Sequence, residues 1–277
     1  MFTDGLDQDG YIAREGSLSR VAAEFAPVVE AARRLLAEAF GDGGRLHSAY
    51  LYGSVPRGTA VAGVSDLDLL VALRRPPTAA DRADADAVEA ALDRAFAQVD
   101  GVGVLLFDTG TLLSELERHD LGWFVACLCT PLLGPDLGAE LPRYRPSPLL
   151  ARETNGDLGL VLPRWREQLA ALGSGSRDEA AETECRLLGR RVGRRLVRTG
   201  FTLVMPRWNG WTSDLVRSAE VFGRYYPQWA APMRLAAEVG RAPTGDLAVL
   251  GTLVDGLGGW LAAEYRAVHG EKRPRPQ

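Results

Sequence analysis

The chain has 277 residues, of which 46% are hydrophobic and 25% are charged, as in globular proteins with one large domain or two modest ones. The formal net charge of −4 argues against binding nucleic acid through bulk electrostatics and mildly favours a cationic small molecule as partner. No apolar run approaches the length of a membrane span, and the acidic N-terminus lacks the regions of a signal peptide, so we expect a cytoplasmic protein with no membrane partner.

Cysteine, histidine and lysine give little support to a metal site or a catalytic triad. Cys127, Cys129 and Cys185 lack metal-ligand spacing and cannot all pair, so we expect reduced, structural thiols. The three histidines are scattered along the chain. Lys272 is the only lysine, so a basic phosphate ligand in the folded body has to be an arginine.

Helix and strand alternate in the first half of the chain. Apolar residues at helical spacing predict a helix over residues 17–40, which Pro27 should kink or restart. Thr78 and Asp81 have the spacing of a capping box and predict the start of a second helix. Three apolar runs predict strands: His47–Tyr52, Leu67–Leu73 and Val102–Phe107.

Strand character fades after Leu112, and the second half of the chain is helical. Three prolines between residues 142 and 148 mark a linker. Helical patterns follow over residues 158–172, 179–199, 213–225, 233–239 and 247–268. We therefore predict an α+β protein. It has an N-terminal domain with a mixed sheet and flanking helices (residues 1–145), a helical bundle domain (146–270) and a disordered tail (271–277).

Two carboxylates at the start of the second predicted strand are the strongest functional signal. Asp66 and Asp68 project from the same face of that strand, whereas Leu67 between them points into the core. Two close carboxylates repel each other unless a cation lies between them. Magnesium takes one or two protein carboxylates and completes its shell with phosphate oxygens and water. The pair therefore predicts a site for a metal-bound nucleotide triphosphate.

A small-residue loop lies between the first two predicted strands. Gly53 has no Cβ, so a phosphate can approach its backbone, and Ser54 adds a hydroxyl and an amide that favour an anion. We expect Arg57 and Thr59 to orient this loop or to contact phosphate, and Ser65 to hydrogen-bond the neighbouring carboxylate or the nucleotide. A common turn followed by a solvated strand is the alternative for each piece alone. The order of the pieces, with an apolar run on each side, favours the nucleotide site.

The pattern Gly53-Ser54, Arg57-Gly58 and Ser65-Asp66-Leu67-Asp68-Leu69 resembles the signature of the DNA polymerase beta-type nucleotidyltransferase superfamily. Within it, the helical second half resembles the aminoglycoside nucleotidyltransferases, especially the streptomycin/spectinomycin adenylyltransferases. The resemblance implies transfer of a nucleoside monophosphate from ATP or another nucleotide triphosphate to a hydroxyl, with release of pyrophosphate. It also implies that Asp66 and Asp68 hold two Mg²⁺ ions and that Gly53 and Ser54 bind the phosphates.

The chain departs from this superfamily at its third carboxylate. The family places that group on the strand after the Asp-x-Asp strand, and the position that aligns most naturally here is Gly103. Asp100 and Asp108 are the nearest carboxylates, and either needs a bulge or a strand end to reach the same face. We take Asp108 as the candidate catalytic residue. A turn or helix cap at Asp108 and a base from the helical domain are the alternatives.

A second departure concerns the helical domain, where the aminoglycoside enzymes carry a lysine that reaches the triphosphate. An arginine has to replace it here, and one helix carries a basic stripe. A solvated, salt-bridged face is the default interpretation of that stripe. The alternative is a phosphate ligand, for which Arg191 is our candidate. The stripe and its neighbours are Arg186, Arg190, Arg191, Arg194, Arg195 and Arg198.

We therefore predict a Mg²⁺-dependent enzyme that transfers AMP from ATP to a small hydroxylated acceptor, with an aminoglycoside-type antibiotic as the leading guess and the helical domain binding it. Such an activity confers antibiotic resistance. Transfer to RNA or to a protein side chain, as in toxin-like or regulatory enzymes, is one alternative. A nucleotide-binding module without catalysis is the other, because Gly103 supplies no third carboxylate. The chain is expected to be a monomer or a homodimer.

Overall fold

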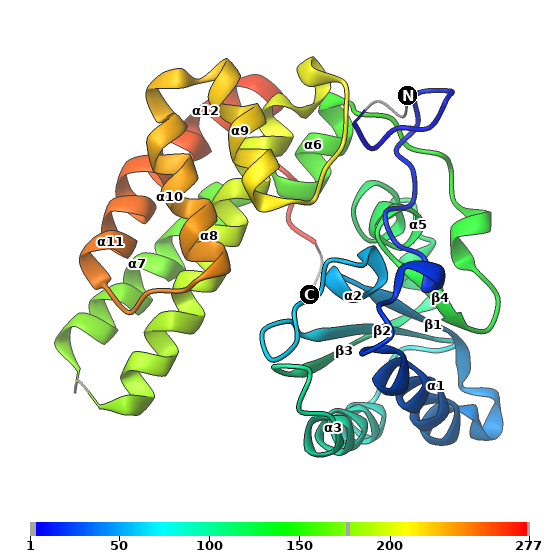
Figure 1. Cartoon of the computed structure of the whole chain (residues 1–277). Helices are drawn as coiled ribbons and strands as arrows, with labels where there is room; N and C mark the ends of the chain where they lie inside the picture. Colours follow the sequence, from blue (N-terminus) through cyan, green and yellow to red (C-terminus); the bar gives the residue numbers. More distant parts are fainter. Residues whose placement is uncertain (1–3, 176–177, 276–277) are drawn as a thin grey trace. The chain divides into compact units, whose positions relative to one another are not determined.

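The computed structural model describes residues 4–175 and 178–275, which form two compact units. One unit comprises Tyr11–Tyr144, and the other comprises Met1–Gly10 together with Arg145–Gln277 (Figure 1). Residues 4–10 attach to the helical unit, where the N–H of Trp211 donates to the carbonyl of Asp4 at 2.7 Å. No local pattern in the sequence indicates this return of the N-terminal segment.

A four-stranded mixed sheet with the order β3-β2-β1-β4 forms the centre of the Tyr11–Tyr144 unit (Figure 1). Strand β1 (Leu46–Tyr52) runs antiparallel to β2 (Leu67–Leu73) and to β4 (Thr130–Leu133), and β3 (Val102–Asp108) runs parallel to β2. The mixed sheet and its flanking helices confirm the predicted fold class.

The sequence analysis missed β4. This strand has only four residues, and Pro131 within it lacks the N–H that a strand donates to its neighbour. Such a segment carries too little apolar alternation to be recognised alone. Tertiary pairing with β1, for example between Leu51 and Thr130, makes it a strand.

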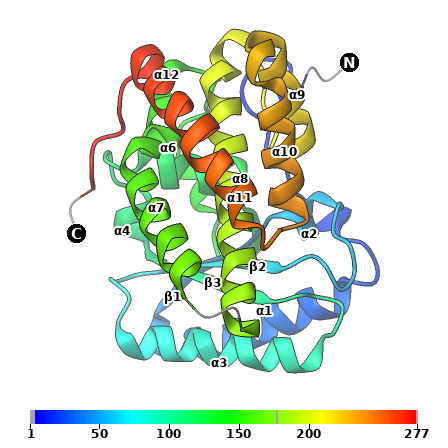
Figure 2. The ribbon, with the colours of Figure 1, turned by 90° about the vertical axis from the view of Figure 1, so that its left-hand side faces the viewer.

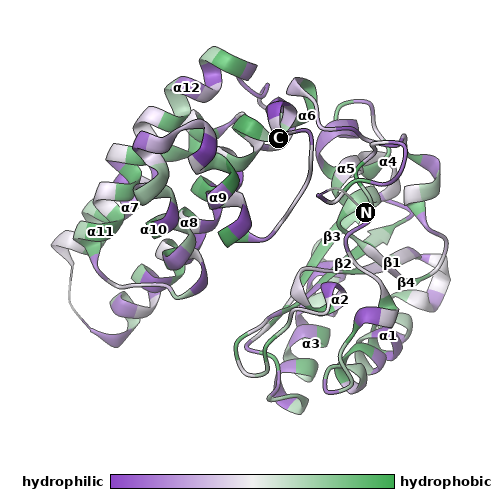
Figure 3. Cartoon of the chain, turned by 45° about the horizontal axis from the view of Figure 1, so that its top comes forward, coloured by the Kyte–Doolittle hydropathy of each residue, from purple (hydrophilic) through white to green (hydrophobic). Residues whose placement is uncertain are grey.

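The two faces of the sheet bury different sets of β2 side chains, and Figure 3 shows the strands as largely hydrophobic. Helices α1 (Ala26–Gly41) and α3 (Ala79–Ala95) cover one face. The opposite face is covered by α4 (Thr109–Leu112), the π-helical turn η3 (Arg118–Gly122), α5 (Trp123–Cys127) and the short η4 (Leu137–Glu140). Side chains toward α1 and α3 are Leu67, Leu69, Val71 and Leu73, and those toward α4 and α5 are Leu70 and Ala72.

The helix starts in this unit follow local sequence. Pro27 lies in the first turn of α1, so it begins the helix rather than kinking it, and only a short 3-10 turn, η1 (Leu18–Arg20), precedes it. The capping box of Thr78 and Asp81 begins α3 as predicted.

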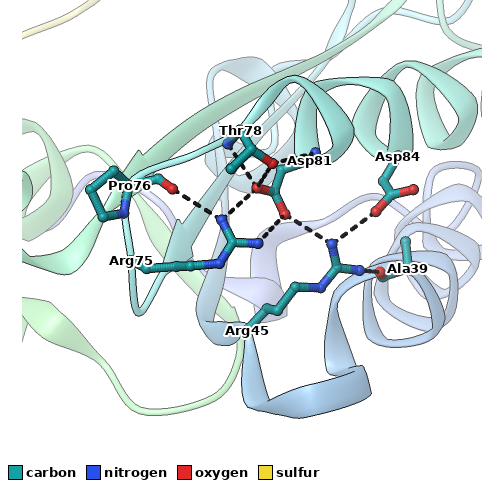
Figure 4. A network of polar contacts seen from close by, with 7 residues as sticks. All are labelled: Ala39, Arg45, Arg75, Pro76, Thr78, Asp81 and Asp84. Carbon is teal, nitrogen blue, oxygen red and sulfur yellow. Dashed lines mark hydrogen bonds and ion pairs between the residues drawn. The ribbon is translucent and has the colours of Figure 1, made fainter.

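A buried ionic network closes the end of the sheet where β1 begins and β2 ends (Figure 4). The side chain of Asp81 is 0% exposed and accepts hydrogen bonds from Arg45 at 2.9 Å, Arg75 at 2.7 Å and the hydroxyl of Thr78 at 2.6 Å. Arg45 also donates to the carbonyl of Ala39 in α1. The Arg75 guanidinium holds the pKa of Asp81 well below its usual value. One carboxylate therefore ties together α1, β1, β2 and α3.

Side chains from α3 cap the outer edge of β3, which is an edge strand. The N–H of Val104 donates to Glu89 at 2.8 Å, and the carbonyl of Val104 accepts from Arg82 at 2.7 Å. Arg82 and Glu89 also pair with each other at 2.6 Å. An edge whose backbone groups are occupied in this way is a poor template for pairing with another chain.

The second unit is a helical bundle around the long helix α8 (Glu179–Trp208) (Figure 2). The predicted end of this helix at Thr199 is wrong. Glycine often ends a helix, but Gly200 is buried inside α8 and makes room for Met233, which a Cβ would strike. The neighbouring helices are α6 (Pro148–Asn155), α7 (Leu158–Ser174), α9 (Leu215–Tyr225) and α10 (Ala230–Arg241).

A third helical region completes the bundle: α11 (Leu247–Gly251), the π-helical segment η6 (Thr252–Gly258) and α12 (Gly259–His269). Contrary to the expectation from sequence, the run Leu247–His269 is long and apolar enough to cross a membrane by length and composition alone. Core helices of soluble proteins pass the same test, and Leu250, Leu257 and Leu261 of this run are buried within the bundle.

The region of the predicted linker leads directly into helix α6. Its last proline, Pro148, lies in the first turn of α6, where Ser147 caps the helix by accepting from the N–H of Leu150 at 3.1 Å. The predicted disordered tail also contacts α6 in part, since Arg275 pairs with Glu153 at 3.1 Å. Residues 276–277 of that tail lie outside the described residues, as do residues 1–3 and 176–177.

Candidate active site

Asp66 and Asp68 lie where β2 begins, at the opposite end of that strand from the Asp81 network. Asp66 directly precedes β2, and Asp68 is its second residue. Both side chains are partly exposed, whereas Leu67 and Leu69 are 0% exposed and pack against α1 and α3. The alternation of a strand therefore leaves both carboxylates on the other face of the sheet.

Gly53 brings the backbone at the end of β1 against the second carboxylate. Tyr52 pairs with Asp68 across the two antiparallel strands, and Gly53 follows with φ 82° and ψ −152°, a region that only glycine occupies readily. A Cβ at this position would clash with Oδ2 of Asp68. The glycine is therefore required both by the backbone conformation and by the closeness of the carboxylate.

A single helical turn, α2 (Ser54–Arg57), follows this glycine. Arg57 donates from Nε to the carbonyl of Gly53 at 3.0 Å, and the N–H of Thr59 donates to the carbonyl of Ser54 at 3.1 Å. This hydrogen bond ties the last residue of α2 to Gly53. It agrees with the loop-orienting role that we considered for Arg57, beside contact with phosphate. Thr59 is exposed, and Ser54 is partly exposed beside Gly53.

Ser65 fastens the loop that leads into Asp66. Its hydroxyl accepts from the N–H of Val61 at 2.9 Å, and its carbonyl accepts from the N–H of Asp100 at 3.1 Å. These bonds fix the chain just before the first carboxylate and join it to the segment before β3.

Residues 17–20 also contact this turn, which the sequence analysis did not predict. The N–H of Ser17 donates to the carbonyl of Pro56 at 2.9 Å. A Cβ at Gly58 would lie 2.7 Å from the carbonyl oxygen of Arg20. Gly58 has φ 73°, and a Cβ at Gly16 would lie 3.0 Å from Cβ of Pro56, so glycines on both sides allow this close approach.

Comparison with known proteins supports this geometry. Residues 33–103 match the family model described as nucleotidyltransferase domain, a range that runs from α1 to Gly103 and includes Gly53, Asp66 and Asp68. The chain therefore contains a nucleotidyltransferase domain. The match confirms the predicted superfamily, in which a Gly-Ser turn precedes an Asp-x-Asp strand.

The fold is also similar to a solved structure described as spectinomycin adenyltransferase AAD(9) from Enterococcus faecialis with ATP and spectinomycin. The TM-score is 0.50 at 12% sequence identity, with 87% of this chain and 98% of that chain covered. At this identity the similarity establishes the fold of the nucleotidyltransferase and no more. A search of curated proteins finds no match.

The nucleotidyltransferase lacks a carboxylate where β3 passes Asp68. In the parallel register Asp68 pairs with Gly103, so the aligned position carries no side chain. Asp108 pairs with Leu73 instead, which puts it about 17 Å further along the strand, at about 3.3 Å per residue. The structure does not bring Asp108 to the pair.

Asp108 has a structural role that explains its position. It caps α4, where its carboxylate accepts from the N–H of Thr111 at 2.9 Å and from the hydroxyl of Thr111 at 2.7 Å. Burial raises the pKa of Asp108, but these hydrogen bonds outweigh that effect and lower the pKa below its usual value. The structure thus supports the helix-cap alternative for Asp108, and the predicted catalytic role is wrong.

The arginines of α8 lie in the helical unit, and several serve structural contacts. Arg186 pairs with Glu182 at 2.6 Å, Arg195 pairs with Asp157, and Arg194 donates to the carbonyl of Gly240 at 3.1 Å. These contacts agree with the salt-bridged face considered for the stripe. Arg191 is exposed on α8, and its binding to phosphate stays a prediction.

The donor set at the start of β2 suits magnesium. Within residues 4–175 and 178–275 no group of three or more histidine, cysteine or carboxylate side chains is placed to hold a metal. Two hard carboxylate oxygen donors on one face, with exposed space beside them, match an ion that takes its remaining ligands from phosphate and water. Asp66 and Asp68 are the residues that would hold it.

Proposed function

We propose that this nucleotidyltransferase transfers AMP from ATP to a hydroxyl of a small, cationic molecule of the aminoglycoside type and releases pyrophosphate. The net charge of −4 suits a cationic acceptor. The solved structure of similar fold is described with ATP and spectinomycin, and this supports the choice of both substrates. Such a reaction belongs in the cytoplasm, where ATP is present, and would inactivate an antibiotic.

The observation that carries this proposal is the contact between Gly53 and Asp68. A turn without a Cβ lies directly against a carboxylate that shares its strand face with Asp66. A phosphate chain seated on Gly53 and Ser54 therefore has its reacting end beside both carboxylates. Arg57, Thr59 and Ser65 keep this turn and the approach to Asp66 in place through their hydrogen bonds.

The proposed transfer is a displacement at the α-phosphorus. The acceptor oxygen forms a bond to that phosphorus, the bond to the bridging β-phosphate oxygen breaks, and pyrophosphate leaves with the electron pair. The hydroxyl proton passes to water at the site, which adjoins the two partly exposed side chains. Bound Mg²⁺, held by Asp66 and Asp68 as two ions, would supply positive charge that stabilises the phosphate oxygens.

A turnover assay tests this proposal. Pyrophosphate release is measured with ATP, Mg²⁺ and a panel of aminoglycosides that includes spectinomycin and streptomycin, for the wild-type enzyme and for Asp66→Asn. We expect release with at least one acceptor, and a fall of about 1,000-fold in the variant, because an electrostatic contact at the reacting phosphate is lost. Circular dichroism should show an unchanged fold, since Asp66 is partly exposed.

Two results would contradict the proposal in different ways. Intact ATP binding without pyrophosphate release for any acceptor would indicate a nucleotide-binding module that does not catalyse transfer. Full activity of Asp66→Asn would show that the reaction does not need the carboxylate pair. Release with RNA as acceptor, falling steeply as salt rises, would point to the nucleic-acid alternative instead.

A further inference from the structure

Two glycines flank the carboxylate pair on the side away from Gly53. Gly103 of β3 pairs with Asp68 in the parallel register, and Gly101 precedes it by two residues, beside Asp66. The N–H of Leu67 donates to the carbonyl of Gly101 at 2.8 Å, which fixes this register at its start. Glycine backbone is therefore the neighbour of both carboxylates, in β3 for Asp68 and just before β3 for Asp66.

The space above these glycines is open. A Cβ at Gly103 would meet nothing within 4 Å, and a Cβ at Gly101 would lie 3.9 Å from Oδ1 of Asp66. Leu105, on the same face as Gly103, is 39% exposed although it belongs to a strand. Glycine in a strand weakens it and often marks a place where a ligand approaches the backbone closely. Gly101, Gly103 and Leu105 thus form a partly exposed surface, which we call the β3 floor.

Oδ2 of Asp68 lies 2.4 Å from the position that a Cβ at Gly53 would take, and Oδ1 of Asp66 lies 3.9 Å from the position that a Cβ at Gly101 would take. Gly53 follows β1 and Gly101 precedes β3, so the pair has a glycine on each side. Attacking and leaving oxygens lie roughly in line in phosphoryl transfer. If the leaving pyrophosphate is seated at Gly53 and Ser54, the attacking hydroxyl has to enter from the opposite side of the pair. That side is the β3 floor.

We infer that the acceptor lies on the β3 floor and that Gly103 is the position that sets how large an acceptor can reach Asp66 and Asp68. This inference rests on the proposed function. The acceptor class is a bulky, hydroxylated molecule whose ring carbons cover Leu105 while one hydroxyl points at the pair. An absent side chain at Gly103 leaves the room that such rings need.

Substitutions that fill the floor test the inference. Gly103→Ala and Gly103→Val are compared with wild type for acceptor kcat/KM, using spectinomycin and streptomycin. The affinity for a non-hydrolysable ATP analogue is measured alongside. We expect acceptor kcat/KM to fall about tenfold for Ala and about 100-fold for Val. The affinity for the analogue should stay within about twofold, because Gly53 lies on the other side of the pair.

The fold should survive both changes. Open space receives the new side chain, and replacing a strand glycine favours the strand, so the melting temperature should be equal or higher. Gly251→Ala in α11 is the matched control, since a Cβ there also meets nothing within 4 Å, and its activity should equal that of wild type. A variant that is more stable and yet poorer with its acceptor separates a specificity role from a structural one.

Each other outcome rejects a distinct claim. Unchanged acceptor kcat/KM in Gly103→Val, with an active wild-type enzyme, rejects the inference and leaves the proposed function intact. Loss of nucleotide affinity in that variant also rejects it, because the floor would then hold the nucleotide. A wild-type enzyme that binds the ATP analogue but neither binds nor modifies any aminoglycoside rejects the proposed acceptor and this inference together.

Discussion

Aspartates in opposite surroundings lie near the two ends of strand β2. Near its far end Asp81 is 0% exposed and held by Arg45 and Arg75. At its start Asp66 and Asp68 are partly exposed, with Gly53 on one side and Gly101 and Gly103 on the other. A buried carboxylate held by matched cations is a structural element, whereas a partly exposed carboxylate beside glycine backbone can be reached from solvent.

The role of an aspartate therefore cannot be inferred from its presence in the sequence alone. Asp108 makes the same point, because it closes a strand as the candidate third carboxylate and turns out to cap α4. What separates the aspartates is what surrounds them. Glycine lies against Asp68 and Asp66 at the end where we propose the active site, and arginine holds Asp81 at the other end.

The largest expected effect on stability is at Asp81. Asp81→Asn removes a buried charge from two arginines, and we expect the free energy of unfolding at pH 7 to fall by about 3 kcal/mol. Urea denaturation measures this. The remaining folded enzyme should keep its kcat, because the network lies at the other end of β2, and a large loss of kcat in folded protein would contradict the contrast between the two ends.

The loss of stability in Asp81→Asn should also depend on pH. The folded pKa of Asp81 is lowered from its ordinary value of 3.8, so its contribution is fully present above that value and is lost as pH falls through the folded pKa. We expect the stability difference between wild type and Asp81→Asn to be constant from about pH 5 to pH 7 and to shrink at pH 3.

The next effect is on activity, at Gly53. Gly53→Ala forces a Cβ into Oδ2 of Asp68 and into a conformation that suits glycine, and we expect kcat to fall about 100-fold. Gly43→Ala is the control, since Gly43 also has positive φ, at 66°, but nothing lies within 4 Å of its Cβ position. That control should lose about 1 kcal/mol of stability and no activity.

The smallest effect concerns the edge beside the β3 floor. Glu89→Ala releases the N–H of Val104 and the partner of Arg82, and we expect a loss of about 1 kcal/mol with more aggregation on heating. Asp86→Ala removes the other partner of Arg82, an exposed carboxylate, and should cost only about 0.3 kcal/mol. Light scattering and thermal melts compare the two, and equal effects would argue against edge capping by Glu89.

Local sequence was sufficient for much of the fold. The three apolar runs became β1, β2 and β3, the capping box began α3, and the helical second half formed a bundle. These features depend on contacts between residues close in the chain, such as Thr78 with Asp81, or on the alternation of apolar residues. The turn at Gly53-Ser54 and the pair Asp66 and Asp68 were likewise visible as a motif, and the family comparison confirms the domain that carries them.

Tertiary structure alone decided the rest. Strand β4 is a strand through its pairing with β1, and α8 continues past Gly200, where Met233 packs against the glycine. The sequence already aligned Gly103 with the third-carboxylate position, but only the register of β3 against β2 shows Gly103 beside Asp68 and Asp108 at the far end of the strand. Strand register depends on hydrogen bonds between residues far apart in sequence, so no local pattern can fix which side chains become neighbours across the sheet.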